Sequence, residues 1–383
     1  MRRDRCTKHI FQAGLFRLVS FLQAGLFPPT KPHGVDGSGA AGVDIGTHAN
    51  LGSTPTMGQR ANLVVVRDDQ WQLYYDHWCA NRLDRELFWG PQLATEFVQS
   101  RGPVDRVSGW LDNVWCEGGA VIDHDRRVLL WFGGEDIMWD PVERSIHARA
   151  MAHVWAGWEI RWARGGVVDL ASYVGVSTGS LRSDRSTGEY PGLRVDVENP
   201  SYNDVAVSIT DTSGIGALRA GGDVEDLELG AGQLPELLGH QRSNNITFDD
   251  LPRFGVHIEL EPKRLALWTC NNTEADFGTL ATVWPGWEIV DLDDDFQQHL
   301  RLAKGTLSWP TPDRAKAWSE LLSSLRAAHQ APSNPALEIA AQMGGTLNPA
   351  TRESRGSVGD PEAKRALVDQ LERELVGLDD GSL

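Results

Sequence analysis

Three polar clusters between residues 76 and 140 hold the residue types that could do chemistry. The first, "DHWCANR", places a histidine two residues before a cysteine, at His77 and Cys79. A thiolate nucleophile needs a neighbouring base to lower its pKa and a third group to orient that base. On a strand both side chains point to one face, at most ~7 Å apart, so a Cys/His pair is possible. We favour the alternative, a half-buried cysteine beside a histidine at a strand end.

The second cluster, "WCEGGAVIDHDRR", carries Glu117 before two glycines and an acidic turn at Asp123–Asp125. Asp-His-Asp has the ligand types of a metal site, but acids are also the usual residues of a solvated hairpin turn. We interpret it as a turn and expect no metal. The polar residues of the first two clusters that could act as nucleophile, base or orienting group are the candidate catalytic residues His77, Cys79, Asn81 and Glu117.

The third cluster is "FGGEDIMWD", where two glycines precede Glu135 and Asp136. Glycines beside acids let a backbone approach a ligand, and equally let a chain turn into a helix. GxxxxGK[ST], GxGxxG, GxSxG and HExxH do not occur, so the sequence predicts no nucleotide site and no cofactor. The candidate binding residues are Trp78, Arg82, Glu135 and Asp136.

The pattern of strands and helices that must position these clusters occurs twice in the chain. "VWAGWEI" at 154–160 returns as "VWPGWEI" at 283–289, and each copy ends a run of strand and helix patterns in the order β-β-α-β-β-α-β. We therefore predict an α+β fold that is a tandem internal duplication: repeat 1 over 57–176, a linker over 177–202 and repeat 2 over 203–306. A period of about 130 residues is too long for a solenoid.

The repeated "WxGWE" corner has a structural interpretation. Its first tryptophan should end an amphipathic helix under the sheet, the glycine should reverse the chain, and the second tryptophan should open a strand. The glutamates Glu159 and Glu288 should then face solvent. The hairpin Gly255–Trp268 matches Gly119–Trp131, with one extra residue at its turn.

Features common to both repeats serve the fold, so function is sought in what only repeat 1 carries. Ten of the 15 tryptophans lie between Trp71 and Trp162, beside the three polar clusters.

The two ends of the chain differ from the repeats. Residues 1–56 read as a disordered upstream extension, with Met57 as the natural start. Residues 307–383 form a helical C-terminal extension. Its first helix, "PDRAKAWSELLSSLRAAH", should pack on repeat 2; a weakly ordered segment and a last helix, "DPEAKRALVDQLERELVGL", follow.

Composition limits the class of protein. Hydrophobic residues make up 41% and charged residues 23%, which is typical of a globular chain. The net charge of −17 argues against non-specific binding to nucleic acid, which requires a basic surface. It would favour basic partners. No run approaches the ~20 apolar residues of a membrane span. Four scattered cysteines without a CxxC pair indicate reduced thiols in the cytoplasm.

From Met57 the segments "MGQRANLVVVRD", "YYDHWCANRL", "WCEGGAVIDHDRRVLLWFGGED" and "VWAGWEIRWA" resemble a set of uncharacterised bacterial proteins, actinobacterial among them. These begin with MGQRAN and carry a similar hairpin and WxGWE corner. The resemblance supports Met57 as the start and implies no activity, cofactor or catalytic residue.

The sequence thus predicts a non-enzymatic binding or interaction protein, of an immunity-like or regulatory kind, with an unknown protein or small molecule as its ligand. The alternative is a small-molecule hydrolase or transferase with its site in repeat 1, around His77, Cys79 and Glu117.

Overall fold

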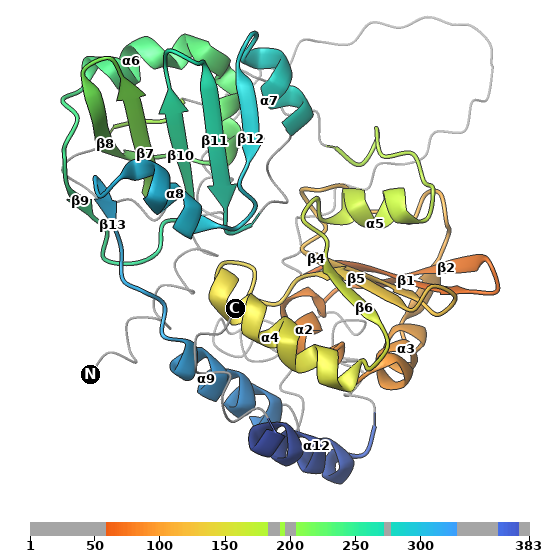
Figure 1. Cartoon of the computed structure of the whole chain (residues 1–383). Coiled ribbons are helices and arrows are strands. Elements are labelled where there is room, and N and C mark those ends of the chain that lie inside the picture. The colour runs from red at the N-terminus through yellow and green to blue at the C-terminus, as the bar shows by residue number, and fades with distance from the viewer. Residues whose placement is uncertain (1–58, 183–191, 196–203, 272–276, 328–358, 375–383) are drawn as a thin grey trace, which may run out of the picture. The chain divides into compact units, whose positions relative to one another are not determined.

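A computed structural model describes residues 59–182, 192–195, 204–271, 277–327 and 359–374 (Figure 1). All of its elements belong to one compact unit, Met57–Leu383. The expectations for residues 1–56 and for the weakly ordered segment after the first C-terminal helix lie outside the described residues, as does most of the 177–202 linker.

Repeat 1 is built on a six-stranded sheet with the order β3-β2-β1-β4-β5-β6. Strand β1 is antiparallel to β2 and parallel to β4, while β5 is antiparallel to β4 and parallel to β6. The elements are β1 Ala61–Arg67, β2 Gln70–Asp76, η1 Ala80–Arg82, α2 Leu83–Glu86, α3 Pro91–Gln99, β3 Gly102–Val104, β4 Gly118–Asp123, β5 Val128–Phe132, α4 Pro141–Val154, β6 Glu159–Trp162 and α5 Val167–Tyr173.

Repeat 2 has a five-stranded sheet with the order β12-β11-β10-β7-β8, and its strands pair in the same parallel and antiparallel senses. The elements are β7 Asp204–Asp211, β8 Gly214–Gly221, η2 Val224–Gln233, α6 Leu234–Gly239, β9 Ile246–Thr247, β10 Phe254–Glu259, β11 Arg264–Thr269, α7 Phe277–Val283, β12 Glu288–Asp291, α8 Phe296–Ala303 and β13 Leu307–Ser308. The α+β fold is confirmed. Both halves follow the expected β-β-α-β-β-α-β order except for one short additional strand after the first helices, β3 in repeat 1 and β9 in repeat 2.

Each sheet is covered by helices on both faces (Figure 1). In repeat 1, one face packs against α2, α3 and α4, and the other against α5. In repeat 2, η2, α6 and α7 cover one face and α8 the other. The central strands are therefore buried on both sides, which explains the unbroken apolar runs of β1 and β4.

The two "WxGWE" corners have the same geometry. Trp155 and Trp284 are both fully buried, and in each corner the two indoles meet edge to face with centroids 5.1 Å apart. The corner glycines have φ of +77° and +78°, a left-handed backbone that L side chains rarely adopt. Glu159 and Glu288 are exposed, so the structural interpretation of the corner is confirmed.

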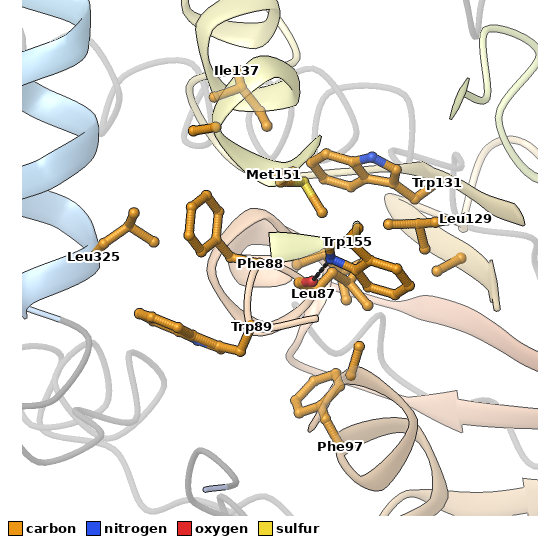
Figure 2. Packing of buried hydrophobic residues seen from close by; sticks show 14 of the residues in the cluster. Leu87, Phe88, Trp89, Phe97, Leu129, Trp131, Ile137, Met151, Trp155 and Leu325 are labelled. Atoms are coloured by element: carbon orange, nitrogen blue, oxygen red, sulfur yellow. Dashed lines mark hydrogen bonds between the residues drawn. The ribbon is translucent and has the colours of Figure 1, made fainter. Parts of the chain in front are cut away.

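Each buried tryptophan also ties its corner to the segment after the first hairpin. The indole of Trp155 donates to the carbonyl of Leu87 at 2.9 Å, and that of Trp284 to the carbonyl of Leu227 at 2.8 Å. Figure 2 shows Trp155 at the centre of the repeat 1 core, with its hydrogen bond to Leu87. The repeated WxGWE motif therefore joins helix, strand and core in the same way in both halves.

The expected extra residue in the second hairpin is wrong. Gly119 pairs with Phe132 across β4 and β5, and Gly255 pairs with Trp268 across β10 and β11. The two hairpins have equal length, so Trp268 corresponds to Phe132 and not to Trp131. Two tryptophans near the strand end suggested the shifted alignment, whereas the ladder sets the register.

The first C-terminal helix packs on repeat 1 and not on repeat 2, which corrects the expectation. Helix α9 (Arg314–Ala327) inserts Trp318, Leu321 and Leu325 into the core that holds Phe88, and Figure 2 shows Leu325 facing Phe88. Helix α12 (Pro361–Glu374) joins the same core and binds α9 through Arg326, which pairs with Asp369 and Glu372. The chain thus leaves repeat 2 and returns to repeat 1.

Candidate functional site

Cys79 lies in the apolar core of repeat 1 rather than at an accessible surface. Its side chain is fully buried in the repeat 1 core, and burial raises the pKa of the thiol well above its usual value. His77 instead hydrogen bonds through Nδ1 to the hydroxyl of Tyr75, at 2.7 Å, and its ring lies edge-on to Trp78. Thiolate chemistry needs the opposite environment, a lowered pKa and access, so this geometry disfavours a Cys/His nucleophile.

The other candidate residues of the three clusters fall into separate places. Glu117 is exposed and accepts a hydrogen bond from the backbone N–H of Arg60, at 3.0 Å. Asn81 lies beside Glu135, whose backbone N–H donates to the Asn81 carbonyl at 3.1 Å. Arg82 faces Glu86 at 3.9 Å. None of the eight candidate side chains lines either pocket described below.

The acidic hairpin is a turn, as expected. Asp123 accepts hydrogen bonds from the backbone N–H groups of Asp125 and Arg126, at 2.9 Å each. It also accepts one from the hydroxyl of Tyr173 at 2.8 Å. Asp125 accepts from the backbone of Asp68 and Asp69. Within the described ranges, no group of three His, Cys, Asp or Glu side chains could hold a metal ion.

A different site is formed by an open pocket of about 240 Å³. Its lining comes from the start of α4, from the loop before β10 and from the segment that leads into α9. Five carboxylates surround it, with one ammonium group: Asp140, Glu143, Asp250, Asp313 and Glu320, with Lys316. We call this the acidic pocket.

One carboxyl group of the acidic pocket, Glu143, and the nearby Asp84 outside its lining have raised pKa values. Burial raises the pKa of Glu143 to about 8, and the negative charges of Asp136, Asp140 and Glu320 add to the shift. Burial also raises the pKa of Asp84 to about 6, against the opposing effect of the Arg85 guanidinium. A carboxyl group that stays protonated near neutral pH is a mark of functional sites in clefts.

Local sequence explains how Glu143 is held. Asp140 caps α4 by accepting from the backbone N–H groups of Val142 and Glu143, at 2.9 Å each, and Pro141 occupies the first helical position. Glu143 is therefore fixed on the first turn of a capped helix. The segment "GGEDIMWD", which could either approach a ligand or turn into a helix, leads into this helix.

Arg144, the next residue, anchors the same helix across the two repeats. Its buried guanidinium donates to the carbonyls of Ile137 and Cys270, both at 3.0 Å, and forms a 2.7 Å ion pair with Asp294. The group also stacks over Trp162 at 4.8 Å. The helix that carries Glu143 is thus held by contacts to both repeats.

The single ammonium does not neutralise the pocket. Lys316 forms a 3.3 Å ion pair with Glu320, and both side chains are more than half exposed, so water screens the pair. Asp313 is used at the start of α9, where it accepts from the backbone N–H of Lys316 at 3.0 Å. The pocket therefore presents an excess of negative charge to whatever enters it.

The second pocket is much smaller, about 20 Å³, and is bounded by Trp139, Asp223, Arg253 and Asn271. The guanidinium of Arg253 lies over the Trp139 ring at 4.5 Å. A space of this size suits one water molecule and no substrate.

Sequence reasoning missed the acidic pocket because its residues come from three distant segments, near positions 140, 250 and 315. Asp136, a predicted binding residue, contributes through its charge on Glu143 without lining the pocket. The available signal was the cap motif Asp140–Glu143 ahead of the helix pattern.

None of the helices in the described ranges is long and apolar enough to cross a membrane. No known protein family, curated protein or solved structure matches the chain.

Proposed function

We propose that the protein is a binding protein without catalysis of its own, and that its acidic pocket accepts a cationic group, an alkylammonium or guanidinium. The observation that carries this proposal is the excess of carboxylates around a preformed pocket, with Glu143 protonated near neutral pH. Burial is the main cause of this raised pKa, and a positive charge in the pocket would offset it and the repulsion from the neighbouring carboxylates.

The pocket has the size of a small-ligand site rather than of a broad surface. A volume of about 240 Å³ fits an aliphatic amine or one lysine or arginine side chain of a partner. Leu251 and Ala317 offer apolar walls for the stem of such a chain, while the carboxylates meet its charged end. An acidic chain with this pocket suits the immunity-like or regulatory role that we propose, directed at a basic partner.

The same features argue against nucleic acid as the partner, because the pocket and the net charge of −17 would repel phosphates. The location that we propose is the cytoplasm. It is supported by Cys79, Cys116 and Cys270, which are free and buried.

Calorimetric titration of the full chain at low salt tests the proposal with two probes, cadaverine and a short oligolysine peptide. Either probe should bind with an affinity that falls as salt rises. Pentane-1,5-diol, which lacks the charges, should not bind. Tighter binding of the peptide would indicate a protein side chain as the natural ligand, and tighter binding of the diamine a free amine.

A matched pair of variants locates the binding. The double variant E143Q/E320Q should lose at least tenfold in affinity, since both carboxylates line the pocket. The control E236Q/E261Q makes the same two residue changes at exposed positions of repeat 2 and should bind as the wild type does. Equal affinity in both double variants, or no binding of either cation by the wild type, would refute the proposal.

A further inference from the structure

Repeat 2 contains a buried chain of hydrogen bonds between side chains of its sheet and of helix α8. Ser208 Oγ lies 2.7 Å from His257 Nδ1 and 2.9 Å from His299 Nε2. The indole Nε1 of Trp268 donates to His299 Nδ1 at 2.8 Å, and His257 Nε2 lies 3.4 Å from Glu259. The first four side chains are at most 3% exposed, whereas the Glu259 side chain is 24% exposed.

The proton positions in this chain follow from its one fixed end. An indole N–H can only donate, so Nδ1 of His299 must accept, and Nε2 of His299 then carries the proton. This N–H donates to Ser208, which leaves the Ser208 hydroxyl to donate to His257 Nδ1. His257 in turn carries its proton on Nε2 and directs it toward Glu259. Both imidazoles are thereby assigned as neutral, with one tautomer each.

Repeat 1 shows that the fold does not require these polar groups. Strand register places Val64 and Val121 where repeat 2 has Ser208 and His257. Phe132 stands for Trp268. An added Cβ on Gly119 would meet Leu170 at 2.5 Å, just as one on Gly255 would meet His299 at 2.5 Å, so Leu170 stands for His299.

The surroundings of the chain oppose a positive charge. Burial lowers the pKa of His299 to about 3, with a further contribution from His257. Burial also lowers the pKa of His257; Arg264 on β11 and Lys304 at the end of α8 act in the same direction, and Glu259 on β10 acts against them. A proton added to His299 Nδ1 would also meet the Trp268 N–H head-on.

We propose that this hydrogen-bond chain is an acid-sensitive switch, in which proton uptake by His257 and His299 breaks the chain and frees helix α8 from the sheet of repeat 2. Helix α8 provides His299, and Ser208 and His257 belong to β7 and β10 in the centre of the sheet. Acidification therefore acts on the contact between this helix and the sheet.

The direction follows from the lowered pKa values. Because the unfolded histidines titrate near ~6.5, the stabilisation is complete above that pH and is lost as the pH falls toward the folded values. Between pH 7.5 and pH 5, His299 alone should raise the population of the opened state about 30-fold.

Hydrogen exchange on the full chain, corrected for intrinsic rates, measures this opening. Amides of α8 should exchange about 30-fold or more faster, relative to intrinsic rates, at pH 5 than at pH 7.5, while those of α5 in repeat 1 stay nearly constant. The variant S208V/H257V/W268F/H299L, which installs the repeat 1 residues, should make α8 insensitive to pH. An unchanged α8 in the wild type, or an equally strong pH response in the variant, would overturn the proposal.

A measurement on the wild type avoids dependence on the folding of that variant. Imidazole ¹⁵N shifts should report His299 neutral at pH 5, with its proton on Nε2, and His257 with its proton also on Nε2. Titration of His299 near its ordinary pKa, or the opposite tautomers, would contradict the switch.

Discussion

The two repeats agree at their corners and differ in their interiors. Both corners bury one tryptophan completely, set the second indole edge-on at 5.1 Å and bond the buried indole to a leucine carbonyl. Yet one sheet interior is apolar around Val64 and Leu170, and the other carries Ser208, His257 and His299 at the matching positions. The shared residues thus form the corner of each half, and the residues that differ give the two sheets different interiors.

The acidic pocket belongs to the unshared part. It depends on Asp140 and Glu143 at the start of α4, and on the segment that returns from repeat 2 to α9. Helix α7 holds the place of α4 in repeat 2 and is only Phe277–Val283, half as long.

The largest effect should come from the shared corner tryptophans. Trp155→Ala and Trp284→Ala each remove a fully buried indole and its hydrogen bond, so each should lower the free energy of unfolding by about 3–5 kcal/mol. Denaturant unfolding followed by circular dichroism measures both. A loss below about 1 kcal/mol in either repeat would break the claim that the corners are equivalent joints.

Arg144→Ala should follow, with a loss of about 3 kcal/mol. The substitution leaves the carbonyls of Ile137 and Cys270 without their buried donor and removes the ion pair with Asp294. The same unfolding assay measures it, with Arg149→Ala on the same helix as the control. Equal stability of the two variants would show that the anchor between the repeats contributes nothing.

Unequal effects are expected at the two glycines that meet the corners. A Cβ at Gly230 would lie 2.2 Å from the Val283 carbonyl oxygen, whereas one at Gly90 would lie 3.3 Å from that of Val154. Both have positive φ, so Gly90→Ala should cost about 1 kcal/mol and Gly230→Ala about 3 kcal/mol. Thermal unfolding ranks the two, and a reversed order would contradict the closer packing in repeat 2.

Glu143→Gln should have an effect that depends on pH. A pKa raised to about 8 means that Glu143 stabilises the fold while protonated and loses this stabilisation as the pH rises from ~4.5 through 8. The variant should therefore exceed the wild type by about 2 kcal/mol at pH 9, after discount for partial exposure, and by much less at pH 5. A stability difference that does not change with pH would mean that Glu143 is an ordinary exposed acid.

Much of the fold could be predicted because its signals are local. The alternating side chains of Trp158–Trp162 are typical of a strand, which is β6, and the spacing of Ile146, Ala150 and Met151 is typical of the inner face of a helix, which is α4. The direction of α9 could not be predicted, because an amphipathic helix carries no mark of which sheet it covers. The hairpin register depended on strand pairing rather than on residue similarity.

The sites were harder to predict for the same reason. His257 and Ser208 each interrupt an apolar strand, and alignment of the repeats in the correct register would have set them against valines. Both residues belong to repeat 2, whereas the candidate sites were predicted among residues that only repeat 1 carries. Cys79 and His77 were close in sequence, but a core residue and a tyrosine-bound ring do not form a pair.

The most direct test of the proposed binding site is the number of protons released when cadaverine binds at pH 7. Glu143 holds a proton in the free pocket at that pH, and a bound cation should displace it, since an adjacent positive charge lowers the pKa of a carboxyl group. Calorimetry in phosphate and in Tris should then give binding enthalpies that differ by nearly the difference in buffer ionisation heats. This buffer dependence should vanish in Glu143→Gln. Equal binding enthalpies of the wild type in both buffers, or an equally large buffer dependence in the variant, would contradict the account.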